Sequence, residues 1–400
     1  MGVAASGLAA DIRISGGRHV TQDWSAAQVW EIVARHPDWF AGVGDSGQLT
    51  WVGQGESYSV WRVGDPGALG GPGADDAGEQ GGALILRLAR RPTGELPVPA
   101  VEEFTGLRLA PAGLGPRVIG MGAIGLEAIG RGAIGMEAIG LGERAGSDDA
   151  EHSYPYLVQS FVLGVVLPAA QWTDAMRAEL AASFARLHER QWPCPGPVTA
   201  AGAPSGPASR SDSAQVGIDL PAEIEGIVAH WSPRLDSRAR AVWEPFVAPM
   251  RAYGRELAAE FAALASFSQL HGDPALTNIL VAQGTPRLID WEWTQIGDPA
   301  RDLAFVGGQV HAHPWYGPLT DRQITGLLTA YREAGGRGDL DALRRRRDLW
   351  LALEGFAVLA YLLWVAGDPR QTPAAHHAES IRSLTATLGP ALAPCGRSPG

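Results

Sequence analysis

Amphipathic periodicity is the first signal along the chain, and it lies in residues 25–40. Apolar and weakly polar side chains recur there at intervals of three and four, at Val29, Ile32, Val33 and His36. That spacing places them on one helical face. Ser25 and Gln28 are spaced as a capping box, and Pro37 is a stop signal. The pattern therefore predicts a helix that begins at Ser25 and is stopped by Pro37.

The pattern then changes to that of strands. Residues 50–63 and 82–88 are rich in β-branched, aromatic and aliphatic side chains, and the run between them is too poor in apolar groups to pack. We expect two strands joined by a long mobile loop. A helix over residues 102–109 and strands over 116–119 and 156–162 would complete a mostly β first lobe.

An Ala-Ile-Gly repeat forms an insert in this lobe over residues 121–142. Its copies begin at a strict period of five, at Ala123, Ala128, Ala133 and Ala138. Neither a flat strand nor an α-helix keeps residues of that period on one face. A low-complexity hairpin and a lid or partner-docking flap are both open as interpretations. The likeness to pentapeptide-repeat solenoids covers at most one coil.

The rest of the chain has helical periodicity. Residues 173–190 carry one apolar stripe, which consists of Met176, Leu180, Phe184 and Leu187. Further helices are predicted over residues 222–231, 242–265, 321–334, 340–365 and 377–387. We therefore expect two domains, a β-rich lobe over residues 1–162 and a helical lobe over residues 163–400.

Charge narrows the classes of function. The chain has 43 acidic and 32 basic residues and a net charge of -11. This balance argues against a nucleic-acid binder, which would carry a basic face, and it suits cationic small molecules. Every basic residue is arginine, which indicates compositional bias. Cys194 and Cys395 lie far apart and no charged-then-apolar leader opens the chain, so we expect neither disulfides nor secretion, and a cytoplasmic location is the default.

Residues 349–367 form an apolar run of nearly membrane length behind four arginines. Glu354 lies inside this run, and a carboxylate in the hydrocarbon of a bilayer is costly. We therefore predict a buried helix rather than a membrane span.

The stretch HGDPALTNIL, residues 271–280, combines groups that suit phosphoryl transfer. That reaction needs metal ions on the phosphates and a carboxylate at the attacking hydroxyl. Asp273 can accept or orient a hydroxyl proton, and Asn278 offers an amide oxygen to Mg²⁺. Asp290 follows an apolar strand in PRLIDWEW, where a carboxylate can be held rigidly against a metal and phosphates.

These motifs resemble those of aminoglycoside phosphotransferases and their relatives, which are small-molecule kinases with the protein-kinase-like fold. That family pairs HGDxxxxN with a downstream IDWExxxxGDPxxDLA, and residues 271–278 and 289–304 match both. The resemblance implies an α+β, bilobal fold with a nucleotide-binding first lobe and a helical second lobe. It also implies that Asp273 is the catalytic base and that Asn278 and Asp290 are the metal ligands.

Other residues around these motifs have structural interpretations. The resemblance implies that Asp302 braces the loop of Asp273, and that Asp298 with Pro299 opens a helix. Trp291 follows a strand end, where a bulky aromatic residue is more often core than cleft lining. Two histidines of HAHPWYG have a spacing found in metal sites but no neighbouring ligand in sequence, and we interpret His311 and His313 as loop histidines.

Upstream, GQGESYSV resembles a kinase glycine-rich loop. Gly53 and Gly55 match its first two glycines, whereas Tyr58 stands where the third would be. Ser57 and backbone N–H groups remain able to contact phosphates. The backbone of Ser160 and Val162 lies where the resemblance places the hinge that meets the purine.

Kinases usually carry a lysine on the third strand, and this chain has none. Arg87 is the basic side chain on the corresponding face of LILRLAR, and arginine can bind phosphate and a carboxylate at once. Glu102 is the expected helix partner, with Glu103 a close rival.

The expected activity is transfer of the γ-phosphoryl group of ATP, or GTP, with Mg²⁺, to a hydroxyl of a small cationic natural product such as an aminoglycoside. Acidic residues that could face such an acceptor, or simply begin a solvated helix, are Asp212, Asp219, Glu223 and Glu225. One alternative is a peptide kinase in natural-product maturation, for which the repeat would supply surface. Another is a catalytically inactive scaffold, nucleotide-binding or nucleotide-free, that keeps the fold without turnover. The oligomeric state is open.

Overall fold

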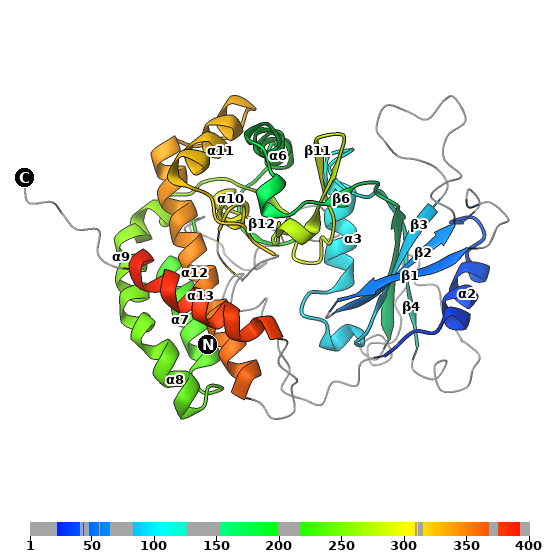
Figure 1. The fold of residues 1–400 in the computed structure, drawn as a ribbon, viewed down its shortest axis with the longest axis horizontal. Coiled ribbons are helices and arrows are strands. Elements are labelled where there is room, and N and C mark those ends of the chain that lie inside the picture. The colour runs from blue at the N-terminus through cyan, green and yellow to red at the C-terminus, as the bar shows by residue number, and fades with distance from the viewer. Residues whose placement is uncertain are drawn as a thin grey trace, which may run out of the picture. The chain divides into compact units, whose positions relative to one another are not determined.

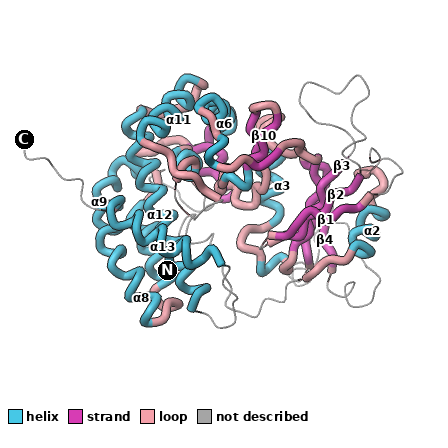
Figure 2. The backbone as a smooth tube through the Cα atoms, in the orientation of Figure 1, coloured by secondary structure: helices cyan, strands magenta, loops and turns pink. Residues whose placement is uncertain are grey.

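The structure is a computed structural model, and it describes residues 22–40, 43, 48–55, 57–64, 83–125, 153–198, 217–308, 310, 315–367 and 375–392. The described residues divide into two compact units, one that ends at Gly164 and one that begins at Val165. Figures 1 and 2 show the β-rich first unit and the mainly helical second unit. The loop expected after residue 64, the repeat beyond Gly125, and both histidines of HAHPWYG lie outside the described residues.

The first unit is built on one antiparallel sheet of five strands in the order β1-β2-β3-β5-β4. Its strands are β1 Leu49–Gln54, β2 Tyr58–Gly64, β3 Ala83–Ala89, β4 Val118–Ile124 and β5 Tyr154–Ser160. The prediction of one strand over residues 50–63 is wrong, because the chain reverses there. The N–H of Gly55 donates to the carbonyl of Tyr58 at 2.8 Å and closes a hairpin between β1 and β2.

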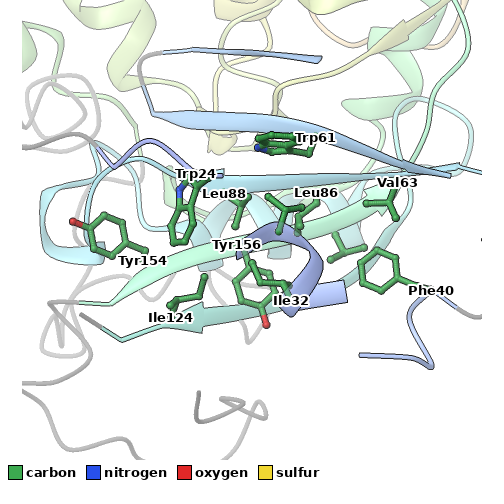
Figure 3. Packing of buried hydrophobic residues seen from close by; sticks show 12 residues of the cluster. Trp24, Ile32, Phe40, Trp61, Val63, Leu86, Leu88, Ile124, Tyr154 and Tyr156 are labelled. Atoms are coloured by element: carbon green, nitrogen blue, oxygen red, sulfur yellow. The ribbon is translucent and has the colours of Figure 1, made fainter. Parts of the chain in front are cut away.

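Helix α2, Ala26–Arg35, confirms the predicted capping box. The Ser25 hydroxyl accepts from the Gln28 N–H at 3.4 Å, and the Gln28 side chain accepts from the Ser25 N–H at 2.9 Å. Val29 and Ile32 are fully buried in the core cluster of this unit. Figure 3 shows Ile32 packed with Leu86, Leu88 and Tyr156 from the sheet.

The second helix of this unit, α3 Ala100–Leu109, packs against β4 and β5. Successive side chains of a strand point to opposite faces. Leu86 and Leu88 belong to the core cluster with α2, so Arg87 between them points to the opposite face, where it meets α3. A 3₁₀ turn, η1 Thr93–Glu95, connects β3 to α3.

The second unit is mainly helical. Its helices are α6 Asp174–Leu187, α7 Leu220–Trp231, α8 Ser237–Trp243, α9 Val247–Ala262, α10 Ala300–Phe305, α11 Asp321–Glu333, α12 Leu340–Gly367 and α13 Ala375–Ala391. The prediction of one helix over residues 242–265 is wrong. A 3₁₀ turn, η3 Glu244–Phe246, separates α8 from α9, and Pro245 within it has no N–H to continue a helical ladder.

Two small sheets position loops in this unit. β6 Val165–Val166, β10 Ile279–Ala282 and β11 Thr285–Leu288 form one, in the order β11-β10-β6. β7 Gln191–Trp192, β9 Phe267–Leu270, β12 Gln295–Gly297 and β8 Gly196–Pro197 form the other, in the order β7-β9-β12-β8. The remaining 3₁₀ turns are η2 Ala169–Gln171 and η4 Leu276–Asn278.

Helix α12 contains the apolar run and is long and apolar enough to cross a membrane by length and composition. Within the unit, 72% of its most apolar window is buried. Its Glu354 carboxylate accepts a hydrogen bond from the Arg301 guanidinium at 2.6 Å, and both side chains are buried. The predicted buried helix is therefore confirmed.

Candidate active site

The loop from His271 to Asn278 connects β9 to β10, and its entry needs glycine. Gly272 has a φ of +89°, and a Cβ there would lie 2.0 Å from the carbonyl oxygen of Trp293. A side chain would therefore meet both backbone strain and a clash with backbone. The tight turn that follows β9 is specified by this one residue.

Asp302 braces this turn, as the sequence predicted. Its Oδ2 accepts from the His271 N–H at 2.8 Å and its Oδ1 from the Gly272 N–H at 2.9 Å. His188 Nε2 lies 3.2 Å from Oδ2, and the Asp302 side chain is fully buried. Burial alone would raise the pKa of Asp302, but the hydrogen bonds from His188 and Gly272 hold that pKa below its usual value. An ionised carboxylate therefore anchors two successive backbone amides.

Asp298 begins the helix that presents this brace. Its Oδ1 accepts from the Ala300 N–H at 3.2 Å, while Pro299 already has the helical dihedrals φ -48° and ψ -29°. Its Oδ2 accepts from Arg346 Nε and Trp350 Nε1, each at 3.0 Å. Asp298 therefore caps α10 and also ties it to α12.

His271 connects the loop to the strand end before Asp290. Its Nε2 lies 3.0 Å from the Ile289 carbonyl, and its Nδ1 lies 3.4 Å from the Asp273 N–H. Burial lowers the pKa of His271, which favours a neutral ring. The neutral tautomer that satisfies both contacts donates from Nε2 and accepts at Nδ1. Trp291 is fully buried and stands edge-on to His271, which confirms that it belongs to the core.

Asp273 receives a hydrogen bond on each carboxylate oxygen. The Tyr316 hydroxyl donates to Oδ1 at 2.8 Å, and Asn278 Nδ2 donates to Oδ2 at 3.1 Å. Burial and the nearby charges of Asp290 and Glu354 raise the pKa of Asp273 to about 6, although the Tyr316 and Asn278 hydrogen bonds oppose this rise. The carboxylate is therefore oriented from two sides and titrates close to neutrality.

Tyr316 is a functional neighbour that sequence reasoning missed. It lies 43 residues beyond Asp273 in a loop, so no local spacing links the two. Its ring is buried with Ala275 and Phe305, and the carbonyl of Trp315 accepts from the Leu276 N–H at 2.7 Å. This segment therefore supports the loop through its backbone as well as through the Tyr316 hydroxyl.

Asn278 and Asp290 flank the open end of one hairpin. Ile279 of β10 pairs with Leu288 of β11, and the Ile289 N–H donates to the Asn278 carbonyl at 2.9 Å. Asp290 has a φ of +64°, a left-handed conformation that is uncommon for a residue other than glycine. Such strained backbone concentrates at functional sites.

The donor set around this hairpin fits magnesium. Asn278 Nδ2 donates to both the backbone oxygen and Oδ2 of Asp273, which turns the amide oxygen away from that carboxylate. Within the described ranges, no three His, Cys, Asp or Glu side chains gather as a metal site. Mg²⁺ typically takes one or two protein oxygens and completes its shell with water and substrate phosphates. One amide oxygen and one carboxylate suffice for that mode.

In the first unit, Arg87 pairs with Glu103, the close rival of the expected Glu102. Arg87 Nη1 donates to Glu103 Oε1, and both side chains are buried. Glu102 is half-buried on the neighbouring position of α3. The Tyr58 ring also lies against Arg87, with the guanidinium carbon 4.5 Å from the ring centroid.

The other predicted nucleotide contacts lie at the ends of strands in this unit. Gly53 and Gly55 have open space where a Cβ would stand, and Arg90 Nη1 donates to the Gly55 carbonyl at 3.0 Å. Ser57 is buried beside them. Ser160 ends β5, where its hydroxyl accepts from the Arg117 N–H at 2.8 Å, and Val162 follows two residues later.

Two of the acidic residues that could face a cationic acceptor, Asp219 and Glu225, have structural partners. Asp219 caps α7 by accepting from the Ala222 N–H at 3.1 Å. Glu225 accepts two hydrogen bonds from Arg251 at 2.6 Å each, and Glu223 is buried. Asp212 lies outside the described residues.

The sequence profile of the phosphotransferase enzyme family matches residues 76–350. The chain belongs to this family. It is therefore a kinase-type phosphotransferase that acts on a hydroxyl group. The match spans β3, α3, the loop of Asp273 and the hairpin before Asp290.

Solved structures show the fold of this phosphotransferase. Aminoglycoside phosphotransferase APH(4)-Ia is 13% identical with a TM-score of 0.54, and the alignment covers 91% of this chain and 98% of that one. A choline/ethanolamine kinase family protein from Mesorhizobium loti is 18% identical with a TM-score of 0.53 and coverages of 92% and 95%. The amicoumacin kinase hAmiN, solved with AMP-PNP and Ca²⁺, is 15% identical with a TM-score of 0.53 and coverages of 91% and 94%. The predicted α+β, protein-kinase-like fold is confirmed. Curated protein sequences give no match.

Proposed function

We propose that this phosphotransferase moves the γ-phosphoryl group of ATP, or of GTP, to a hydroxyl of a small cationic natural product such as an aminoglycoside. The observation that carries the proposal is the Asp273 carboxylate, which receives hydrogen bonds from Tyr316 and Asn278 on its two oxygens. A carboxylate held in this way can accept the proton of an attacking hydroxyl.

Asp273 is the base in this proposal. Each of its oxygens has a second lone pair beyond the one used by Tyr316 or Asn278, so a substrate hydroxyl can still donate to it. The buried brace of Asp302 on His271 and Gly272 prevents the loop from shifting as the substrate binds. Reaction in a fixed geometry lowers the entropic part of the barrier.

Asn278 and Asp290 are the proposed Mg²⁺ ligands, through the amide oxygen and the carboxylate. When bound, the metal would neutralise phosphate charge during transfer. The hairpin pairing of Ile279 with Leu288 keeps the two ligands at one end of the same element. Two protein oxygens leave most of the octahedral shell open, which suits an ion that arrives with the nucleotide.

The first unit supplies the proposed nucleotide contacts. Arg87 binds phosphate oxygens while Glu103 holds its guanidinium, a task that the planar fork of arginine allows. Gly53 and Ser57 offer backbone N–H groups to the phosphates. Gly55, whose own N–H donates to the Tyr58 carbonyl, leaves open space beside them. The Ser160 carbonyl and the backbone groups of Val162 meet the purine edge, since the Ser160 N–H already donates to the Arg117 carbonyl at 2.8 Å.

The identity of the acceptor is the most specific part of the proposal. The net charge of -11 favours a cationic compound. One APH(4)-Ia structure is a ternary complex with AMP-PNP and hygromycin B, at 14% identity and a TM-score of 0.53. A panel of aminoglycosides is therefore the first set of acceptors to assay.

Calorimetric titration tests the nucleotide site before any acceptor is known. ATP and GTP would each be titrated with and without Mg²⁺ into the wild type and Asp290→Ala. Glu179→Ala, on an exposed position of α6, removes the same charge and serves as the control. We expect metal-dependent binding that Asp290→Ala alone abolishes. An absence of binding by the wild type would reject the proposal in favour of a scaffold.

A further inference from the structure

The first unit departs from the kinase pattern at two positions, and these two residues touch. Tyr58 stands in place of the third loop glycine, and Arg87 stands in place of the strand lysine. The guanidinium carbon of Arg87 lies 4.5 Å from the centroid of the Tyr58 ring. A cation at that distance from an aromatic face is attracted by it.

Strand register brings the pair together. Tyr58 pairs with Ala89 and Val60 pairs with Arg87 across β2 and β3. Tyr58 and Arg87 are therefore diagonal neighbours on one face of the sheet, which is within reach of aromatic and long side chains. The register of the two strands therefore places both side chains within reach of each other.

The ring is itself held firmly. Tyr58 is 4% exposed and belongs to a buried cluster with Ala89, Leu96 and Ala100. Arg87 is 5% exposed, so water does not screen the contact, and a desolvated cation–π pair is stronger than an exposed one. The ring therefore forms a rigid wall beside the guanidinium.

Two contacts from different elements restrict this guanidinium. Glu103 of α3 accepts from Nη1, and the central carbon of the guanidinium lies over the Tyr58 ring. An arginine side chain has many rotamers, and a carboxylate alone leaves the plane free to rotate about the hydrogen bond. The ring removes that rotation.

We infer that Tyr58 is a positioning residue for Arg87, whose ring sets the plane in which the guanidinium meets the nucleotide phosphates. The two departures from the kinase pattern would then form one coupled unit, in which an aromatic residue that replaces a glycine aligns an arginine that replaces a lysine. This inference rests on the proposed role of Arg87 in binding phosphates.

The test compares binding of ATP with binding of adenosine, which lacks phosphates, by calorimetry. Tyr58→Leu should weaken ATP binding about tenfold and leave adenosine binding unchanged. Tyr58→Phe keeps the ring and should bind ATP like the wild type. In an Arg87→Met background, Tyr58→Leu should cause no further loss of ATP affinity, because the cation that the ring aligns is gone.

A matched control removes a buried aromatic ring from the other face of the same sheet. Tyr154→Leu would do so, since Tyr154 is 7% exposed in the core cluster with α2. It should alter stability without separating ATP from adenosine. Melting temperatures of all variants would show that each is folded.

Three results would overturn the inference while the proposed function stands. Equal losses for ATP and adenosine in Tyr58→Leu would mean a general structural role. A loss in Tyr58→Phe as large as in Tyr58→Leu would exclude the ring as the cause. If Tyr58→Leu kept full ATP affinity while Arg87→Met clearly lost it, the positioning role of Tyr58 would be rejected. The phosphate-binding role of Arg87 would stand. If the wild type fails to bind ATP, or Arg87→Met binds it normally, the proposed function or the role of Arg87 fails, and the inference with it.

Discussion

The loop of Asp273 is held by a buried carboxylate that binds its backbone, whereas Arg87 is held by a carboxylate and a ring that bind its side chain. In the first case the motif residues match the kinase pattern throughout, and the support acts on amides that any sequence would have. In the second case two residues of the kinase pattern are replaced, and the supporting contacts are made by the replacement side chains themselves. A complete motif can rely on backbone anchoring, while a substituted motif needs side-chain contacts of its own.

Removing the Asp302 carboxylate that binds the loop amides tests the first half of this comparison and has the largest expected effect. Asp302→Ala would leave His188 and two loop amides without their buried acceptor, and we expect the free energy of unfolding to fall by about 3–5 kcal/mol. Urea denaturation measures this loss. Asp174→Ala is the control, because it breaks the pair of an exposed carboxylate with Arg177, and it should unfold like the wild type. A small loss in Asp302→Ala would mean that the loop is anchored elsewhere.

Asp273→Asn tests the chemistry that the brace serves. The amide keeps the shape and can still accept from Tyr316, but it cannot take a proton. Phosphoryl transfer to an accepted aminoglycoside should fall by roughly 10²–10⁴-fold, while nucleotide affinity stays unchanged. Coupled-assay kinetics and calorimetry measure the two quantities. Equal losses in both would reject the role of base.

The raised pKa of Asp273 gives the wild type a pH signature. With a pKa of about 6, the carboxylate loses its base form below that pH, so kcat/KM should fall about tenfold per pH unit there. Between pH 3.8, the usual pKa of an aspartate, and about pH 6, Asp273 stays protonated in the folded protein but not in the unfolded chain. The free energy of unfolding of the nucleotide-free protein should therefore fall as the pH rises through that window. Asp273→Asn should lack this fall.

Adjacent acids on α3 allow a matched test of the side-chain anchor. Glu103→Gln and Glu102→Gln change the same charge one position apart, and Glu103 is the acid that accepts from the Arg87 Nη1 group. We expect Glu103→Gln to lower the free energy of unfolding by about 1.5–3 kcal/mol and to weaken ATP binding. Glu102→Gln should do neither. Urea denaturation and calorimetry on both variants measure the two effects. A larger loss of stability and ATP affinity in Glu102→Gln than in Glu103→Gln would reverse the assignment.

The smallest expected effect belongs to Tyr316→Phe, which removes one hydrogen bond from Asp273. That bond lowers the pKa of Asp273, so its loss should raise the pKa and move the acid limb of the kcat/KM profile upward by up to about one pH unit. Tyr154→Phe in the first unit is the control and should leave the profile in place. An unmoved acid limb in Tyr316→Phe would show that the hydroxyl does not act on the carboxylate.

Several features could be predicted because they depend on short spacings. The capping box of Ser25 and Gln28 lies within one helical turn, and the loop of Asp273 is specified by consecutive residues. The apolar run of α12 predicted a buried helix from its length and from Glu354. In each case the signal lies within one continuous stretch, so it can be read along the chain.

Other predictions were wrong where local propensity allows more than one structure. The apolar residues of 50–63 suit a strand throughout, but the turn closed by Gly55 and Tyr58 folds them into a hairpin. Residues 242–265 are periodic enough for one helix, and the break at η3 depends on Pro245 and on the packing of α8 and α9 against α12.

The sequence by itself determined the family motifs, the identity of Asp273, Asn278 and Asp290 as candidates, and the absence of a strand lysine. The tertiary structure alone decided which acid meets Arg87, because neighbouring helical positions differ by about 100° and only docking against the sheet selects one. It also decided that Tyr316 reaches Asp273 and that Tyr58 covers Arg87. The Tyr316 contact joins residues 43 apart in the chain, and the Tyr58 contact depends on the register of two strands. Neither is encoded in any local pattern.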